Sequence, residues 1–108
     1  MRALRIHAAA VEEAVEAAAW YEKERSGLGA DFENALEAAF DLLEQEIVPL
    51  APAPGIAGSR GVKRLLLRRF PYAVVVREYD TEIFVVAIAH HSRRPGYWRD
   101  RLRLLGEE

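Results

Sequence analysis

The sequence predicts a single α+β domain in which a helical hairpin packs on a small antiparallel sheet. Residues 8–47 place apolar side chains at helical spacing, and residues 62–98 contain three β-rich runs separated by short turns. A chain of 108 residues can form one core of two packed layers. We therefore expect one domain over residues 1–108, with a short N-terminal strand, a three- to four-stranded antiparallel sheet and a short C-terminal helical segment.

The first residues predict a short strand at the edge of the sheet. Leu4 and Ile6 alternate with polar neighbours, and this period of two is typical of a half-buried strand.

The first helix is predicted from about Ala8, where the period changes. Apolar residues recur at helical spacing, and charged residues take the other side. The apolar stripe comprises Val11, Ala14, Val15, Ala18 and Tyr21, and the charged side comprises Glu12, Glu13, Glu16 and Lys23. Ser26 and Gly27 are expected to end this helix, and Gly29 to allow a tight reversal.

The second helix is predicted to carry Asp31 in its first turn, where a carboxylate is favoured by the helix dipole. Its apolar stripe comprises Phe32, Leu36, Ala39, Phe40, Leu43 and Ile47. Because so short a turn joins the two helices, they must form an antiparallel hairpin. Trp20 lies about opposite the apolar stripe of the first helix, so it is either exposed to a partner or covers the edge of the hairpin itself.

The proline-rich residues 49–59 are expected to be irregular and to cross from the hairpin to the sheet. The first strand of the meander, over residues 60–70, has no clean apolar face, a conflict that a bulge or a bound partner would resolve. The second strand is expected over residues 72–79 and the third over residues 83–89. The third strand is apolar throughout, so we expect the hairpin on one face and either residues 95–105 or a second protein on the other.

Composition limits the class of protein. The chain has no cysteine, its first residues lack the apolar core of a signal peptide, and no apolar run approaches the roughly 20 residues that span a membrane. We therefore expect a cytoplasmic protein without a membrane partner.

The formal net charge of −2 divides unevenly along the chain. Residues 1–59 carry 4 Lys or Arg against 11 Asp or Glu, giving −7, and residues 60–108 carry 11 against 6, giving +5. The net negative charge argues against a nonspecific nucleic-acid binder. Either the two halves complement each other, or the basic half faces phosphate or an acidic partner.

The segment from His90 to Trp98 follows the third strand and carries histidine, arginine and aromatic side chains. His90 and His91 are neighbours on a strand and point to opposite faces, and no acidic residue lies close in sequence. We therefore expect no metal site, and nothing in the sequence indicates a cofactor.

Several of these residues also have a structural interpretation. His90 would hydrogen-bond the backbone at the end of its strand, and Tyr97 and Trp98 would cover the core. Arg68 and Arg69 would pair with the acidic hairpin or with an acidic partner.

Three motifs together resemble the RelE/ParE superfamily of toxins from type II toxin-antitoxin systems, also called plasmid stabilisation proteins. They are Ala19-Trp20-Tyr21, the run Leu66-Leu67-Arg68-Arg69-Phe70-Pro71-Tyr72, and Ala89-His90 followed by Arg93 or Arg94, Pro95, Tyr97 and Trp98. The resemblance covers nearly the whole chain, with a strand, two helices and a three-stranded meander in the family order.

The resemblance implies a toxin that a cognate antitoxin neutralises. ParE-like members inhibit DNA gyrase, whereas RelE-like members cleave messenger RNA at the ribosome. The acidic helices and the ending favour the ParE-like, non-enzymatic mechanism. A metal-independent ribosome-dependent endoribonuclease is the first alternative, and an inactive relic that still binds antitoxin is the second. A homodimer is compatible with each of these.

The resemblance also indicates candidate site residues. RNA cleavage would need a base, an acid and cations around a phosphate that is attacked by the neighbouring 2′-hydroxyl. The candidates for that chemistry are His90, Lys63, Arg68, Arg93 and Tyr97. The candidates for binding a target or the antitoxin are Arg64, Arg68, Arg69, Arg93, Arg94, Tyr97, Trp98 and Trp20.

Overall fold

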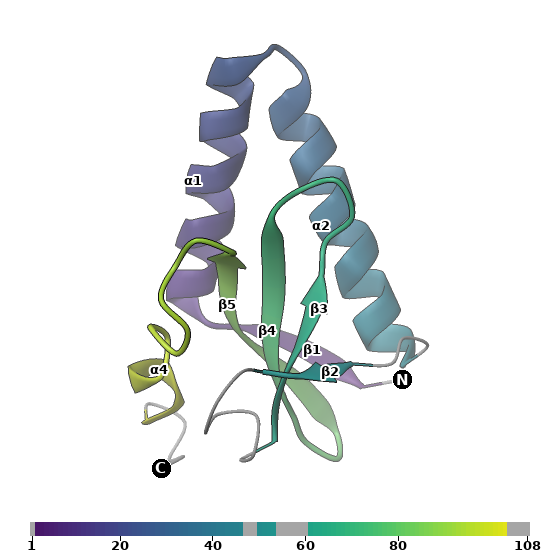
Figure 1. Cartoon of the computed structure of the whole chain (residues 1–108). Helices are drawn as coiled ribbons and strands as arrows, with labels where there is room; N and C mark the ends of the chain where they lie inside the picture. The colour runs from purple at the N-terminus through teal and green to yellow at the C-terminus, as the bar shows by residue number, and fades with distance from the viewer. Residues whose placement is uncertain (1, 47–49, 54–60, 104–108) are drawn as a thin grey trace.

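The computed structural model describes residues 2–46, 50–53 and 61–103, and Figure 1 shows the arrangement of its elements. The elements in chain order are β1 (Ala3–Ile6), α1 (Ala8–Glu24), α2 (Leu28–Gln45), β2 (Ala51–Pro52), β3 (Val62–Leu66), β4 (Tyr72–Glu78), β5 (Glu82–His90) and α4 (Asp100–Arg103). The predicted α+β class, helical hairpin and short C-terminal helix are confirmed.

The sheet has five strands in the order β1-β5-β4-β3-β2. Strands β3, β4 and β5 form the predicted antiparallel meander. Strand β1 takes the predicted edge position but runs parallel to β5, so the sheet is mixed. A parallel pair needs a long connection, and here residues 7–81 lie between the two strands. Strand β2 forms within the segment that was expected to be irregular, at the opposite edge, where a proline is tolerated.

The helical hairpin covers one face of the sheet (Figure 1). Phe32, Leu36 and Leu43 of α2 are buried against valines of β4 and β5, as the predicted stripe requires. Aromatic rings of both layers meet near the β3–β4 turn, where Tyr21 stacks on Phe32 with ring centroids 5.4 Å apart. Ile47, the last predicted member of this stripe, lies outside the described residues.

The predicted apolar stripe of α1 is partly wrong. Val11 and Val15 are 46% and 63% exposed, whereas Ala10 and Ala17 are buried. The face of α1 that packs on its neighbours carries the smallest side chains rather than the most hydrophobic ones. Small alanines let the helix backbone approach those neighbours closely. Glu13, which was expected on the charged side, instead points toward β5 and the C-terminal segment.

The two glycines of the hairpin have roles that differ from the prediction. Gly27, with φ of 90°, makes the reversal and caps α2. Gly29 lies inside α2, where an added Cβ would come within 2.7 Å of the Ala18 carbonyl oxygen of α1. Gly29 is therefore needed for close helix packing, and not for the turn to which the sequence assigned it.

The other side of the sheet, here called the second face, has its own small core. Five residues are buried there, Val62, Val75, Phe84, Val86 and Trp98. The C-terminal segment therefore covers β5, which is one of the two predicted alternatives. The predicted strand over residues 60–70 had no clean apolar face. This conflict resolves because β3 ends at Leu66 and a turn with Arg69 at φ of 72° follows.

The only register shift in the β4–β5 pair falls between Val75 and Val76.

Within the described residues, no helix is both long enough and apolar enough to cross a membrane.

Candidate functional site

A shallow hollow lies on the second face, between residues of β3, β4 and the end of β5 and the segment that follows β5. Its volume is about 90 Å³. It is lined by Ala53, Arg64, Ala73, Val75, Ala89, His90, His91, Arg93, Arg94, Pro95, Gly96, Tyr97 and Trp98. We call it the arginine hollow. Three of the lining residues are alanines, Ala53, Ala73 and Ala89, whose small side chains leave space beside the arginines.

The segment after β5 is folded by local hydrogen bonds. The Ser92 amide donates to Nδ1 of His90 over 2.9 Å, so this nitrogen is an acceptor and the neutral ring carries its proton on Nε2. This contact confirms the expected hydrogen bond between His90 and the backbone. The Arg93 amide donates to the His90 carbonyl, and Gly96 takes a φ of 81° that reverses the chain again.

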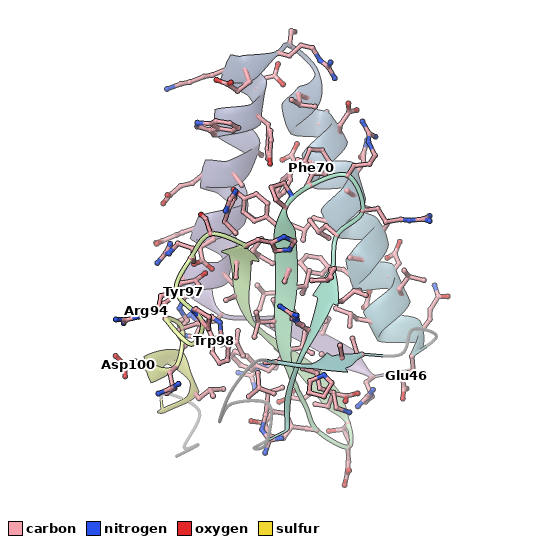
Figure 2. All side chains as sticks on the ribbon, in the orientation of Figure 1. Glu46, Phe70, Arg94, Tyr97, Trp98 and Asp100 are labelled. Atoms are coloured by element: carbon pink, nitrogen blue, oxygen red, sulfur yellow. The ribbon has the colours of Figure 1, made fainter. Side chains whose placement is uncertain are left out.

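Trp98 then enters the core of the second face and is only 4% exposed. Figure 2 shows Arg94, Tyr97 and Trp98 gathered beside the sheet. The predicted role of Trp98 as a cover of the core is thus confirmed.

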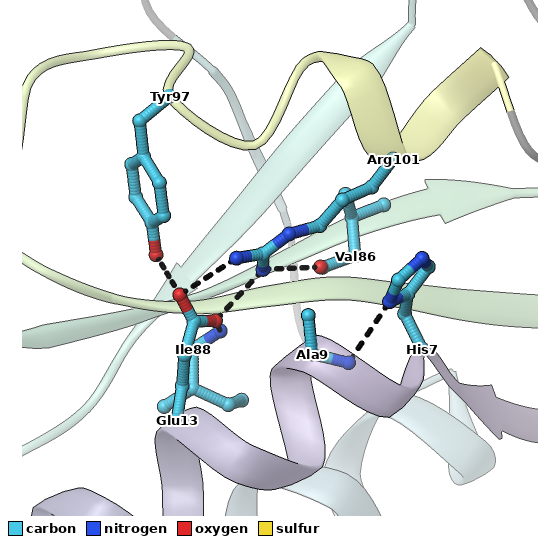
Figure 3. A network of polar contacts seen from close by, with 7 residues as sticks. All are labelled: His7, Ala9, Glu13, Val86, Ile88, Tyr97 and Arg101. Atoms are coloured by element: carbon cyan, nitrogen blue, oxygen red, sulfur yellow. Dashed lines mark hydrogen bonds and ion pairs between the residues drawn. The ribbon is translucent and has the colours of Figure 1, made fainter.

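A partly buried carboxylate anchors this segment to α1 (Figure 3). Glu13 accepts a hydrogen bond of 2.6 Å from the Tyr97 hydroxyl and one of 3.0 Å from the Ile88 amide. Arg101 donates two more, of 2.8 and 3.0 Å, and also donates to the Val86 carbonyl. One carboxylate therefore joins α1, β5 and the C-terminal segment.

The network fixes the protonation of its members. Burial by itself would raise the pKa of Glu13, but hydrogen bonds from Arg101, Tyr97 and Ile88 outweigh burial, and the pKa is lowered. Burial, reinforced by the Glu13 carboxylate, raises the pKa of Tyr97. Tyr97 is therefore protonated, and its hydroxyl donates a hydrogen bond to Glu13 within the protein.

Tyr97 also supports an arginine of the hollow. The Arg93 guanidinium lies 3.8 Å from the centre of the Tyr97 ring, and that of Arg101 lies 5.3 Å from it. A guanidinium at this distance from a ring is attracted by the ring's quadrupole. The position of Arg93 is thus linked through Tyr97 to Glu13.

The structure brings some of the predicted site residues together and separates others. His90, Arg93 and Tyr97 meet at the arginine hollow, with Arg64, Arg94 and Trp98. Lys63 pairs with Glu78 over 2.7 Å, in a cluster to which Arg2 and Glu46 belong.

The remaining predicted binding residues lie elsewhere. Arg68 borders a different cavity, and Arg69 lies 3.9 Å from Asp31 of the acidic hairpin, as its structural interpretation required. Trp20 is 56% exposed and its ring contacts Tyr21 edge-on, with centroids 5.1 Å apart.

Sequence reasoning missed Glu13 and Arg101. The two residues are 88 positions apart, and Glu13 stands in a helix rich in exposed glutamates. No local pattern distinguishes it from Glu12 or Glu16, so only the tertiary structure identifies it.

A second surface is an apolar groove of about 370 Å³ between α2 and the edge of the sheet. It is lined by Ala35, Ala38, Ala39, Leu42, Leu65, Leu66, Leu67 and Arg68. Leu66 is 51% exposed there, and β2 pairs with Lys63 and Arg64 only. The run of three leucines was the sequence signal for this groove. We call it the leucine groove.

Comparisons with known proteins agree with one another. The model of the family described as the ParE toxin of the type II toxin-antitoxin system parDE matches residues 4–95. A chain in the structure of the chromosomal ParDE TA system from P. aeruginosa is similar, with a TM-score of 0.54 and 25% sequence identity. That match covers 83% of this chain and 96% of the other. Among curated proteins, none is significantly similar in sequence.

Proposed function

Because the chain belongs to the ParE toxin family of type II toxin-antitoxin systems, we propose that it inhibits DNA gyrase and that a cognate antitoxin neutralises it. The observation that carries the proposal is the family match over residues 4–95. Gyrase works in the cytoplasm, so the proposal also assigns the protein to that compartment.

The distribution of side chains supports a non-enzymatic mechanism. General acid-base catalysis needs groups within hydrogen-bond reach of one reacting centre. Lys63 is paired with Glu78, Arg68 borders the leucine groove, and the Tyr97 hydroxyl donates to Glu13. These three candidates for ribonuclease chemistry therefore lie in different surroundings and do not converge on one reacting centre. This separation favours inhibition through binding over RNA cleavage.

The leucine groove supports the antitoxin part of the proposal. Its lining is apolar except for Arg68, and the outer edge of β3 at Leu65 and Leu66 has no strand partner among the described residues. An antitoxin segment could bury apolar side chains in the groove and hydrogen-bond the exposed edge, the two modes by which peptides commonly bind such surfaces. We propose that the antitoxin docks there.

The test is to induce the protein without antitoxin in a bacterial host and to follow labelled thymidine and methionine incorporation over the first minutes. Early loss of thymidine incorporation is expected, because gyrase inhibition stops replication. Early loss of methionine incorporation while DNA synthesis continues would instead support the ribosome and messenger RNA as targets. No effect on either would identify a relic without a toxic activity.

A second assay uses purified components instead of living cells. Purified protein should block supercoiling of relaxed plasmid by purified gyrase, and addition of the protein encoded beside the toxin gene should restore it. Supercoiling that proceeds at the uninhibited rate would contradict the proposal.

A further inference from the structure

The arginine hollow has the composition of an anion site. Three arginines and two histidines line it, and none of the described residues that line it is Asp or Glu. Among the described residues, Arg64, Arg93 and Arg94 form no ion pair, whereas Arg2, Arg5, Arg69 and Arg101 each pair with a carboxylate. The cations of the hollow are therefore available to a ligand.

The hollow also contains an unsatisfied donor. Nε of Arg64 is buried and has no hydrogen-bond partner in the described part of the chain. A buried donor without an acceptor is costly, and a bound ion is one of its ordinary explanations.

The hollow is held in shape before any ligand arrives. Trp98 is buried behind it, and Tyr97 is fixed by Glu13 and supports the Arg93 guanidinium. Preorganised donors bind more tightly than mobile ones because less side-chain freedom is lost on binding.

The donors of the hollow favour phosphate over carboxylate. The hollow is open to solvent, and its volume of about 90 Å³ leaves room for the oxygens of one anionic group. A phosphate group offers more acceptor oxygens than the two of a carboxylate, so it can satisfy several guanidinium forks at once.

The charge distribution indicates where the phosphate comes from. The acidic hairpin covers one face of the sheet, and the unpaired arginines lie on the second face. A polyanion would be repelled by the first face and attracted to the second.

We propose that the arginine hollow binds a phosphate group, and that this group is a backbone phosphodiester of the DNA that gyrase holds. The identity of the DNA rests on the proposed function, whereas the phosphate site does not.

The first test uses inorganic phosphate and amide resonances in NMR spectra, with chloride keeping the ionic strength constant. Saturable shifts are expected at Arg64, Ala73, Ala89 and Gly96. Arg64→Gln and Arg94→Gln should each weaken binding at least about tenfold, since charge-assisted hydrogen bonds are lost. Arg25→Gln, at the far end of the hairpin, is the control and should leave binding unchanged.

Two results would overturn the phosphate site. One is the absence of saturable shifts at the hollow. The other is a set of shifts produced by an oligoglutamate peptide but not by phosphate, which would identify an acidic protein segment as the ligand.

The second test uses a short DNA duplex without terminal phosphates. Binding of wild-type protein to the duplex should weaken as the salt concentration rises. Arg64→Gln should reduce the slope of log affinity against log salt concentration by about 1, the loss of one phosphate contact. If inorganic phosphate binds and the duplex does not, the assignment to DNA is overturned. If the site binds both ligands but gyrase is not inhibited, the proposed function fails and the phosphate site stands.

Discussion

Glu13 shows how one side chain can organise a surface. It accepts four hydrogen bonds, from Ile88, Tyr97 and both terminal nitrogens of Arg101. The side chains of Glu13 and Arg101 are only 16% and 17% exposed, so the pair is weakly screened by water. Their interaction holds the C-terminal segment against α1 and β5.

Glu13→Gln should lower the free energy of unfolding by about 2 kcal/mol, because charge-assisted hydrogen bonds become neutral and one acceptor becomes a donor. Urea unfolding measures this change. Glu16→Gln, in the same helix but exposed, is the matched control and should change stability by less than about 0.5 kcal/mol. Equal effects of the two substitutions would contradict the anchoring role.

Acid should remove the contribution of Glu13. Its pKa in the folded protein lies below the ordinary value of 4.5, so its stabilisation is fully present above the unfolded pKa and is lost as pH falls through the folded pKa. The difference in unfolding free energy between wild type and Glu13→Gln should therefore be constant at neutral pH and should shrink below pH 4.5. A difference that grew on acidification would have the wrong sign.

The packing of the helical hairpin depends on the absence of a side chain at Gly29. At Gly29, α2 approaches the backbone of α1 so closely that an added Cβ would lie 2.7 Å from the Ala18 oxygen. The Glu22 carboxylate accepts hydrogen bonds from the amides of Gly27 and Gly29 and closes the same junction. Both contacts fix the angle at which the helices leave the turn.

Gly29→Ala should destabilise the protein by about 1–3 kcal/mol, although alanine favours a helix by about 1 kcal/mol. The reason is that the atom contacted is a backbone oxygen, which cannot move without separating the helices. Thermal unfolding measures the change. Ala30→Gly, at the next, exposed position, should cost about 1 kcal/mol through helix propensity alone. Stabilisation by Gly29→Ala would show that the helices separate at little cost.

For the whole molecule, the sheet separates two kinds of surface. The hairpin carries most of the acidic residues on one side, while the arginine hollow lies on the other and the leucine groove opens at the edge. Of the two alternatives for the charge division, compensation between the acidic and basic halves therefore holds only in part. Arg69 and Arg101 pair with the hairpin, and the arginines of the hollow do not.

Leu66→Glu should weaken antitoxin binding by at least about tenfold, because a charge would be buried in the apolar groove. Toxicity should remain while protection by the co-expressed antitoxin is lost. Val15→Glu changes an apolar residue of α1 that is 63% exposed, against 51% for Leu66, and should leave protection intact. Loss of protection in both variants, or in neither, would contradict docking in the leucine groove.

Much of this architecture was predictable because it depends on local periodicity. The strand, the two helices and the meander follow from spacings of two and 3.6 residues. Their bounds agree closely with the prediction, except that β3 (Val62–Leu66) is much shorter than the strand expected over residues 60–70. The predicted stripe of α2 was also correct for the members that the structure describes, since large side chains such as Phe32 and Leu43 leave little choice of face.

By itself, the sequence determined the fold class, the order of the elements and, through the motifs near Phe70 and Tyr97, the family. Only the tertiary structure decided that β1 runs parallel to β5, that Glu13 anchors Tyr97 and Arg101, and that Arg64 joins Arg93 and Arg94 at one hollow. The physical reason is that periodicity reports which face of an element is buried. It does not report which distant side chain meets that face, because such pairings depend on how the layers pack.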